Sequence, residues 1–246
     1  MNGLAQSLLF PDWPAPASVR ACVTTRAGGT SLPPYDSFNL GDHVGDQPAA
    51  VAENRRRLSE TFAIQPAWLK QVHGVQVAHA DPSTVAEADA SWTSTPGIAC
   101  TVMTADCLPV LFCDRAGSRV AAAHAGWRGL AGGVLEATLD SLGVPAEDVL
   151  VWLGPAIGPQ AFEVGLEVRD AFTAAHPGAA SAFVDGERPG KLMADIYALA
   201  RLRLAAHGAT AVYGGGLCTV SDPRFFSYRR TPQGGRFASL VWLAPR

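Results

Sequence analysis

The chain lacks any apolar segment long enough to span a membrane. Among its 246 residues, Gly, Pro, Asp or Arg interrupts every apolar run before it reaches the roughly 18 residues that a bilayer requires. Residues 1–16 contain no Lys or Arg ahead of the short apolar run at 7–10, so they do not resemble a signal peptide. We therefore expect a cytoplasmic protein without a membrane partner.

An excess of basic charge is also missing. Lys and Arg number 19 against 22 Asp and Glu, which gives a formal net charge of −3. Since a protein that binds a phosphate backbone usually presents a basic face, no nucleic-acid partner is expected. Lysine is especially scarce, with only Lys70 and Lys191. An anion-binding site in this chain would therefore be built from arginine guanidinium groups.

The five cysteines are odd in number and lack Cys-x-x-Cys spacing, which argues against a disulfide framework and against a zinc ribbon. No internal repeat or low-complexity linker divides the chain. What it does contain is a dense alternation of short apolar segments and loops. We predict a single domain over residues 1–246, with a mixed β-sheet core flanked by helices, of the α+β or α/β type.

The apolar segments differ in period, which separates strands from helices. Alternating or continuous apolar patterns predict strands at residues 19–25, 72–79, 97–103, 108–113, 119–124, 148–153, 209–220 and 238–243. Apolar residues that recur about every 3.6 positions predict helices at residues 48–62, 129–142, 163–175 and 191–207. Several strands end in loops that carry reactive side chains, the usual position of a functional site on a rigid scaffold.

Three such strand ends carry His73, Asp106 with Cys107, and His124. Burying polar groups of this kind costs free energy unless they find partners. Two imidazoles and one thiolate suit Zn²⁺ with a fourth position left open for water. The separations of 34 and 17 residues match no short metal motif, however, so ordinary core residues remain the alternative at each position.

A series of long, ordered motifs adds a family resemblance. The motifs are TTRAGGTS, YDSFNLGDHVGD, WLKQVHG, TADCLPVLF, AAAHAGWRGL, LGPAIGPQAFEVG and CTVSDPRFFSYRR. They resemble the polyphenol oxidase or laccase-domain family, also called the peptidoglycan editing factor or purine nucleoside phosphorylase family. In that family the His of QVHG, the Cys of ADC and the His of HAGW bind zinc, so the resemblance implies His73, Cys107 and His124 as zinc ligands.

The resemblance also implies a fold and an activity. The fold is a single α+β domain with mixed sheets, related to the cysteine-dependent deamidase domain of a bacterial toxin. The activity is phosphorolysis of the purine nucleosides adenosine, inosine, guanosine and methylthioadenosine in the cytosol, with adenosine deamination at the same site. For deamination, zinc would activate water for attack on the purine ring, and Asp106 would relay a proton. An Asx-type bond that caps its own turn is the alternative role for Asp106.

Phosphorolysis further requires an anion site, which arginines suit because the guanidinium fork is bidentate. Arg26 and Arg128 are the first candidates, with Arg229 and Arg230 behind them, and a surface salt bridge is the alternative for each. Contacts with the base or ribose are predicted for Asn39, and stacking on the purine for Phe225, Phe226 or Tyr228; core packing is the alternative for these aromatic residues.

The same residues allow two other functions. Without metal, Cys107 as nucleophile and His124 as base would give a cysteine hydrolase, such as an amidase that edits peptidoglycan precursors. With Cu²⁺ in place of Zn²⁺, two His and one Cys would support slow oxidation of phenols. Six histidines without a His-x-His pair argue against true multicopper chemistry. A binding module that carries out no reaction is the remaining alternative.

Overall fold

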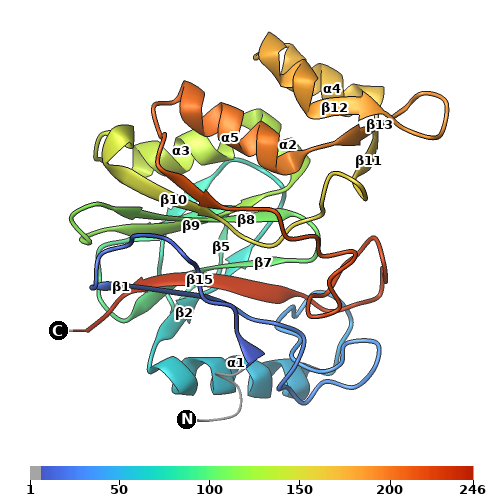
Figure 1. Ribbon diagram of the computed structural model, residues 1–246. Coiled ribbons are helices and arrows are strands. Elements are labelled where there is room, and N and C mark those ends of the chain that lie inside the picture. Colours follow the sequence, from blue (N-terminus) through green and yellow to red (C-terminus); the bar gives the residue numbers. More distant parts are fainter. Residues whose placement is uncertain (1–6, 246) are drawn as a thin grey trace.

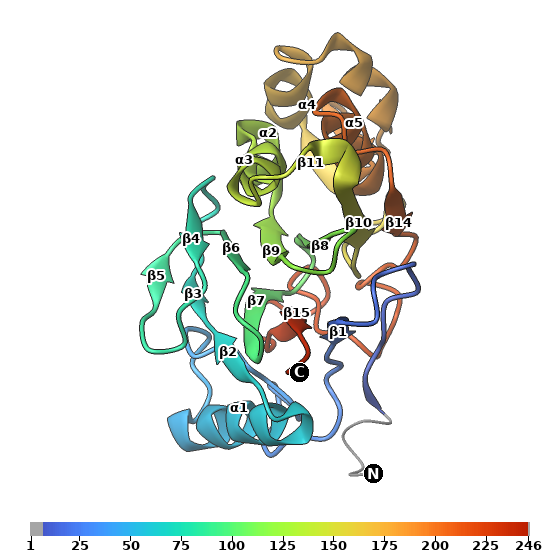
Figure 2. The same ribbon diagram turned by 90° about the vertical axis from the view of Figure 1, so that its left-hand side faces the viewer.

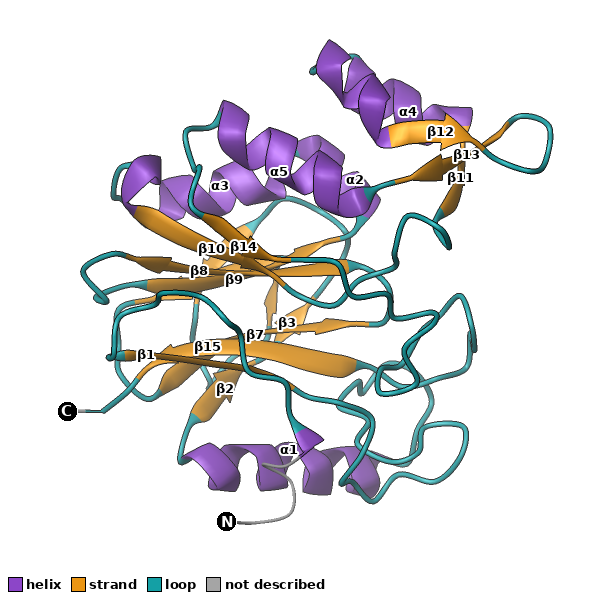
Figure 3. Cartoon of the chain, viewed as in Figure 1, coloured by secondary structure: helices purple, strands orange, loops and turns teal. Residues whose placement is uncertain are grey.

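The computed structural model describes residues 7–245, which form four layers: a helix, two sheets and a second group of helices (Figures 1 and 3). The first sheet has four strands, in the order β1 (Val19–Val23), β15 (Phe237–Leu243), β7 (Ile98–Thr104) and β2 (Gln65–Ala67). The second has six, in the order β14 (Val212–Gly214), β10 (Val149–Leu153), β8 (Leu108–Asp114), β9 (Val120–Ala125), β6 (Ala90–Thr93) and β4 (Val77–His79).

Both sheets mix parallel and antiparallel pairs. In the four-stranded sheet, β15 runs antiparallel to β1 and β7, whereas β2 runs parallel to β7. In the six-stranded sheet, β14 and β4 are the parallel members, at its two edges. The predicted α+β fold with mixed sheets is thereby confirmed.

Helices cover the two outer faces, as Figure 2 shows from the side. Helix α1 (Pro48–Phe62) packs on the four-stranded sheet and has the predicted bounds. Helices α2 (Trp127–Gly132), α3 (Val134–Ser141) and α5 (Ile196–Ala206) cover the six-stranded sheet. Within residues 7–245, no helix has the length and apolar character needed to cross a membrane.

Smaller elements extend these layers. The antiparallel strands β11 (Glu163–Gly165), β13 (Lys191–Ala194) and β12 (Phe183–Asp185) form a separate small sheet beside α4 (Leu166–Thr173) and the 3₁₀ helix η3 (Pro177–Ala182). Strands β3 (Leu69–Lys70) and β5 (Ala86–Glu87) form a two-stranded parallel pair, and the 3₁₀ helix η2 (Ala146–Asp148) precedes β10.

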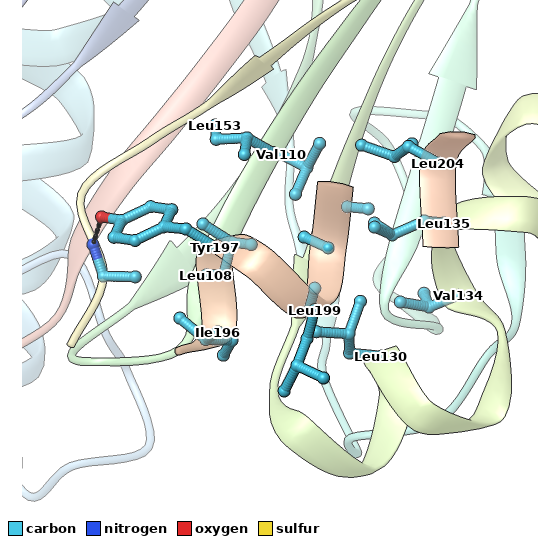
Figure 4. Close-up of a cluster of buried hydrophobic side chains, with 14 of the residues drawn as sticks. Leu108, Val110, Leu130, Val134, Leu135, Leu153, Ile196, Tyr197, Leu199 and Leu204 are labelled. Carbon is cyan, nitrogen blue, oxygen red and sulfur yellow. Dashed lines mark hydrogen bonds between the residues drawn. The ribbon is translucent and has the colours of Figure 1, made fainter. Parts of the chain in front are cut away.

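The central strands are apolar on both faces because both faces are buried. Along β15, Phe237 and Val241 point into the core between the sheets, whereas Leu240 and Trp242 point toward α1. The six-stranded sheet presents its other face to α2, α3 and α5, and Figure 4 shows the apolar side chains that pack there. In the same view, the hydroxyl of Tyr197 accepts a hydrogen bond from the Ala156 amide at 2.8 Å. This bond ties α5 to the loop after β10.

Two predicted helices begin as strands. Residues 163–165 pair with β13 as strand β11, so the helix predicted at 163–175 starts only at Leu166. Residues 191–194 form β13, and Asp195 then caps α5 by accepting hydrogen bonds from the amides of Tyr197 and Ala198. At both positions strand pairing holds the first residues in an extended conformation, although the apolar spacing predicts a helix. At the second position, the capping side chain of Asp195 then sets where the helix begins.

Three other predicted elements are shorter or divided. The helix predicted at 129–142 is split into α2 and α3 at Gly133, whose φ of 104° only glycine adopts readily. Of the strand predicted at 72–79, only β4 forms, and residues 72–74 are a loop. Of the strand predicted at 209–220, only β14 forms, because Gly214 to Gly216 all have positive φ angles.

Candidate metal centre

The side chains of His73, Cys107 and His124 meet at one end of the space between the two large sheets. Cys107 lies in the connection that crosses from β7 to β8, and therefore from one sheet to the other. His124 lies near the end of β9. It is on the same face of the strand as Val120 and Ala122, which point into the inter-sheet core. His73 comes from the loop between β3 and β4. We call these residues the candidate ligand group.

The geometry of the candidate ligand group fits a tetrahedral metal ion. Its potential ligand atoms all lie within 4.8 Å of one another, and the Cys107 Sγ to His73 Nε2 distance is 3.8 Å. Zinc with Zn–S and Zn–N bonds of ordinary length holds sulfur and nitrogen ligands about 3.5 Å apart. Within residues 7–245, this is the one group of three or more His, Cys, Asp or Glu side chains so arranged. Three protein ligands leave a fourth position open, as in catalytic zinc sites.

Gly126 leaves room for the candidate ligand group. A Cβ atom at this position would lie 2.7 Å from Cδ2 of His73 and 3.2 Å from Sγ of Cys107. The residue has φ −63° and ψ 156°, which any amino acid adopts, so its backbone does not require glycine. The close approach to the two side chains therefore explains the glycine.

Asp89, which no sequence motif pointed to, connects the histidines. Its carboxylate is fully buried and accepts hydrogen bonds from the amides of Val72, His73 and Gly74 at 2.6 to 3.1 Å. The same carboxylate lies 2.8 Å from Nδ1 of His124. Because Nδ1 is engaged there, Nε2 is the nitrogen that His124 offers to a metal. The only sequence signal was an acidic residue between alanines, directly before strand β6.

The loop that carries His73 is fixed at a second point. Gln71 exchanges two hydrogen bonds of 2.8 Å with the backbone of Met103 in β7. His73 itself has a φ of 61°, in the left-handed region that is rare for residues other than glycine. Its imidazole meets that of His124 edge to face, with the ring centroids 4.7 Å apart. The surrounding bonds thus hold His73 in a conformation that its own backbone does not favour.

The electrostatics of the candidate ligand group favour an ionised thiol. Burial on its own raises the pKa of Cys107, but His124 and His73 outweigh it through charge and hydrogen bonding and lower the pKa to about 6. Burial opposes protonation of His124, whereas Cys107 and Asp89 favour it and raise the pKa of His124 to about 9. The thiolate is the form of cysteine that binds metals and attacks electrophiles.

Asp106 uses both carboxylate oxygens within the protein. Oδ1 accepts a hydrogen bond of 2.6 Å from the Thr219 hydroxyl, and Oδ2 accepts one of 2.6 Å from the Arg229 amide. Its carbonyl also accepts a bond from the Ile157 amide at 2.9 Å. Asp106 has a φ of 91°, and these bonds from two distant loops hold the turn that presents Cys107.

The candidate ligand group opens into a cavity of ≈ 420 Å³, a size that suits a small-molecule ligand. An apolar part of its wall comes from Trp127, Ile157, Phe162 and Ile196. A polar part comes from His43, Tyr228, Arg229 and Arg236. The loop of His43 and the loop of Tyr228, Arg229 and Arg236 lie together at one end of the sheets, on the right-hand side of Figure 1, although the sequence separates the two loops widely.

A model of the family described as multi-copper polyphenol oxidoreductase laccase matches residues 20–244. The chain belongs to this laccase family. Among its relatives, a protein of Pseudomonas aeruginosa called purine nucleoside phosphorylase is 72% identical over 236 residues, which cover 96% of this chain and 98% of that protein. The purine nucleoside phosphorylase YfiH of Escherichia coli K12 is 55% identical over 241 residues, with 96% and 98% covered.

Solved structures of similar chains have the same fold. The crystal structure of Neisseria meningitidis protein NMB0706 is 53% identical and superposes with a TM-score of 0.94, covering 97% of this chain and 100% of that one. The structure of YlmD from Geobacillus stearothermophilus is 31% identical, with a TM-score of 0.86 and 93% of each chain covered.

In this laccase-family chain, only some of the predicted substrate-binding residues line the cavity. Arg229 and Tyr228 do, and the Arg229 guanidinium also donates to the carbonyls of Ala161 and Glu163. Arg26 lies elsewhere and pairs with Asp36 at 2.9 Å. The remaining candidates also lie outside the cavity wall: Asn39, Arg128, Phe225, Phe226 and Arg230.

Each of these outlying residues has a structural partner. Asn39 is fully buried and accepts hydrogen bonds from the amides of Gly41 and Arg236. The guanidinium of Arg128 lies 4.4 Å from the ring centroid of its neighbour Trp127. Arg230 donates to backbone carbonyls at 2.7 and 2.9 Å, and Phe225 and Phe226 belong to the inter-sheet core.

His43 and Arg236 line the cavity but were not selected from the sequence. His43 stands in the GDHVGD part of a recognised motif, which was the available signal. Arg236 follows Gly234-Gly235 and directly precedes β15, a position that resembles an ordinary strand boundary. Its role depends on which strand β15 pairs with, and a single sequence does not supply that information.

Proposed function

We propose that the protein is a purine nucleoside phosphorylase that acts on adenosine, inosine, guanosine and methylthioadenosine in the cavity beside the candidate ligand group. The observation that carries the proposal is the 72% identity to the Pseudomonas aeruginosa purine nucleoside phosphorylase over 96% of this chain. The conversion of adenosine to inosine at the same site, with Zn²⁺ as the metal, belongs to the proposal.

In phosphorolysis, a phosphate oxygen forms a bond to C1′ of the ribose while the bond from C1′ to N9 breaks. The purine leaves with the electron pair and takes up a proton, and the other product is ribose 1-phosphate, or 5-methylthioribose 1-phosphate when the substrate is methylthioadenosine. The cavity would therefore hold a flat base, a ribose and an anion together. Its apolar wall of Trp127, Ile157, Phe162 and Ile196 suits the base, and the guanidinium groups of Arg229 and Arg236 on its polar side suit the anion.

Bound to the candidate ligand group, Zn²⁺ would supply a Lewis acid and lower the pKa of water at its open position. His73, Cys107 and His124 would hold it, and Asp89 would keep His124 in the tautomer that presents Nε2. Because both carboxylate oxygens of Asp106 already accept hydrogen bonds, we assign it the task of fixing the Cys107 turn, in preference to the proton relay.

A second function is favoured by one specific observation. Cys107, His124 and Asp89 also have the arrangement of a nucleophile, a base and the carboxylate that orients the base. Without metal, this arrangement would suit a cysteine hydrolase, including an amidase for peptidoglycan precursors. Metal dependence separates the two functions, since zinc would occupy the thiolate that a hydrolase needs free.

The decisive assay incubates the purified protein with inosine and phosphate, and separately with adenosine. Release of hypoxanthine and ribose 1-phosphate that requires phosphate is the expected result. The Cys107→Ala variant should lose roughly three orders of magnitude in rate, because it removes one of three metal ligands. Cys218→Ala is the matched control, since Cys218 is also partly exposed but lies outside the cavity wall.

The outcomes separate the candidates clearly. Full phosphorolysis by Cys107→Ala would contradict the site, and no turnover of any of the four nucleosides would contradict the function. Activity that disappears on chelation and returns with zinc supports the metal-dependent reaction. A chelated protein that instead hydrolyses a muropeptide nucleotide would support the cysteine hydrolase.

A further inference from the structure

Arg236 reaches the cavity because of the pairing between β7 and β15. In that antiparallel pair, Phe237 lies opposite Thr104, so Arg236, just before β15, lies at the same end of the sheet as the turn that follows β7. That turn carries Cys107, and both Arg236 and Cys107 line the cavity. The last strand thus places a guanidinium on the same wall as the candidate ligand group.

The guanidinium of Arg236 is incompletely used by the protein. Nη1 donates to the carbonyls of Gly234 and Gly235, both at 3.0 Å. Nε and Nη2 have no acceptor among residues 7–245, and no carboxylate of these residues lies within 4.0 Å. Arg203, which is buried, instead forms an ion pair with Glu136. Arg236 is half-buried and its guanidinium carbon lies 5.9 Å from the ring centroid of Tyr228, so Nε and Nη2 stay available to a ligand in the cavity.

Carboxylates of the cavity wall do not fill this role. Asp106 is the one acidic residue among the described residues that line the cavity, and its oxygens are taken by Thr219 and by the Arg229 amide. Thr104, also in the wall, has an Oγ1 without a hydrogen-bond partner within the described chain. The wall therefore offers unused hydrogen-bond donors and a guanidinium that no carboxylate of the described residues pairs with directly.

Asn39 fixes Arg236 in place. Its Oδ1 accepts hydrogen bonds from the Arg236 amide at 2.8 Å and from the Gly41 amide at 2.9 Å. A Cβ at Gly41 would lie 2.9 Å from Cγ of Arg236, so the side-chain stem packs directly on this loop. The same loop continues to His43 in the cavity wall. Arg236 is thus held before any ligand arrives, which lowers the entropy lost on binding.

We infer that Arg236 binds the phosphate co-substrate, donating from Nε and Nη2 to two phosphate oxygens. A bidentate pair between a guanidinium and a phosphate is the geometry that these two free donors allow. The inference rests on the proposed function in taking inorganic phosphate as the anion. It assigns phosphate to the side of the cavity formed by β15 and the loop of Asn39, and leaves the apolar wall to the base.

The test measures binding of inorganic phosphate by isothermal titration calorimetry to the zinc-loaded protein. In Arg236→Gln the affinity should fall roughly tenfold to a hundredfold, the value of a lost charged hydrogen-bonded pair. Arg236→Lys should fall less, because it keeps the charge and loses the fork. The matched control is Arg20→Gln, since Nη1 of Arg20 also donates to two nearby carbonyls but lies outside the cavity wall.

Activity and metal content supply further readouts. The KM for phosphate should rise in Arg236→Gln while the KM for inosine and the zinc content stay close to those of the unmodified protein. An unchanged phosphate affinity in this variant would overturn the inference, as would an equal loss in Arg20→Gln. Phosphate binding that depends on Arg236 in a protein without phosphorylase activity would uphold the inference and reject the proposed function.

A measurement without substitution covers the case in which Arg236→Gln fails to fold. Phenylglyoxal modifies accessible arginines, and mass spectrometry locates the modified residues. Phosphate should protect Arg236 from modification and leave Arg20 unprotected. Equal modification of Arg236 with and without phosphate would overturn the inference.

Discussion

At the scale of single residues, Asp89 determines whether the histidines of the candidate ligand group are usable. One carboxylate holds the backbone of the loop that carries His73 and the Nδ1 of His124. Burial opposes its ionisation, but the hydrogen bonds from His124 and from the Gly74 amide prevail and lower the pKa of Asp89. A metal site of this kind depends as much on the residue that orients its ligands through hydrogen bonds as on the ligands themselves.

We predict that Asp89→Asn lowers zinc affinity by roughly tenfold to a hundredfold, the usual effect of losing a carboxylate that orients a ligating histidine. Competition with a chromophoric chelator measures the affinity directly. Asp140→Asn is the matched control, because Asp140 forms a 2.8 Å pair with His207 on the surface. Unchanged zinc affinity in Asp89→Asn would show that His124 is oriented by other contacts.

A second prediction concerns the metal-free thiol. Because the pKa of Cys107 is lowered to about 6, the thiolate predominates above that pH and the thiol below it. The rate of alkylation by iodoacetamide should therefore rise between about pH 5 and pH 7 and then level off, whereas an ordinary thiol reacts faster up to about pH 9. Zinc should protect Cys107. The measurement uses a Cys218→Ser background and mass spectrometry.

A midpoint near the ordinary thiol pKa would contradict the electrostatic account of Cys107. The same experiment on His124→Ala should move the midpoint upward, because the charge and the hydrogen bond of His124 are the main influences that oppose burial.

At the scale of residues, only part of the candidate site could be predicted from the sequence. The three members of the candidate ligand group could be named from motifs, since His73 and Cys107 lie in loops between strands and His124 lies near the end of a strand. Asp89 and Arg236 could not, because their roles arise from contacts with residues far away in the chain. Asn39 was assigned a ligand contact by its motif, yet its side chain is buried against the Arg236 amide. The motifs thus identified the segments that form the site, but they did not show which atoms each side chain contacts.

At the scale of elements, the start of helix α2 limits the space around the candidate ligand group. Gly126→Ala is predicted to preserve the fold, because the φ and ψ angles of this residue suit alanine. It should reduce zinc affinity roughly tenfold or more, because the added methyl group displaces His73 and Cys107. Chelator competition and thermal unfolding measure the two properties. Gly178→Ala is the control, since its Cβ would make only ordinary contact at 3.8 Å. Full zinc affinity in the Gly126 variant would contradict the steric account.

Element prediction succeeded where local pattern and tertiary context agree. Strands β7, β8 and β9 and helix α1 lie close to their predicted positions. Each is long, and the residues that its apolar pattern marks as buried are the ones that the fold buries. The segments at 163–165 and 191–194 were assigned to helices, although they pair with each other in a small sheet. Their strand state depends on this pairing across the chain, which no local period contains.

At the scale of the whole molecule, the metal content can be predicted. The described chain brings together one candidate ligand group, and the sequence has six histidines without a His-x-His pair. We expect about one zinc ion per chain by elemental mass spectrometry. Copper at the same ligands should give one copper per chain and slow phenol oxidation that is lost in Cys107→Ala. Two or more tightly bound metals per chain would contradict a single site.

The position of β15 has a consequence for synthesis. It follows every other described strand in the chain, yet it lies inside the four-stranded sheet between β1 and β7. While a ribosome is still making residues 237–243, β1 and β7 have no partner between them, and the guanidinium of Arg236 cannot yet be placed. The cavity can therefore be completed only after the nascent chain has emerged through β15, so metal loading and catalysis would begin after translation of this strand.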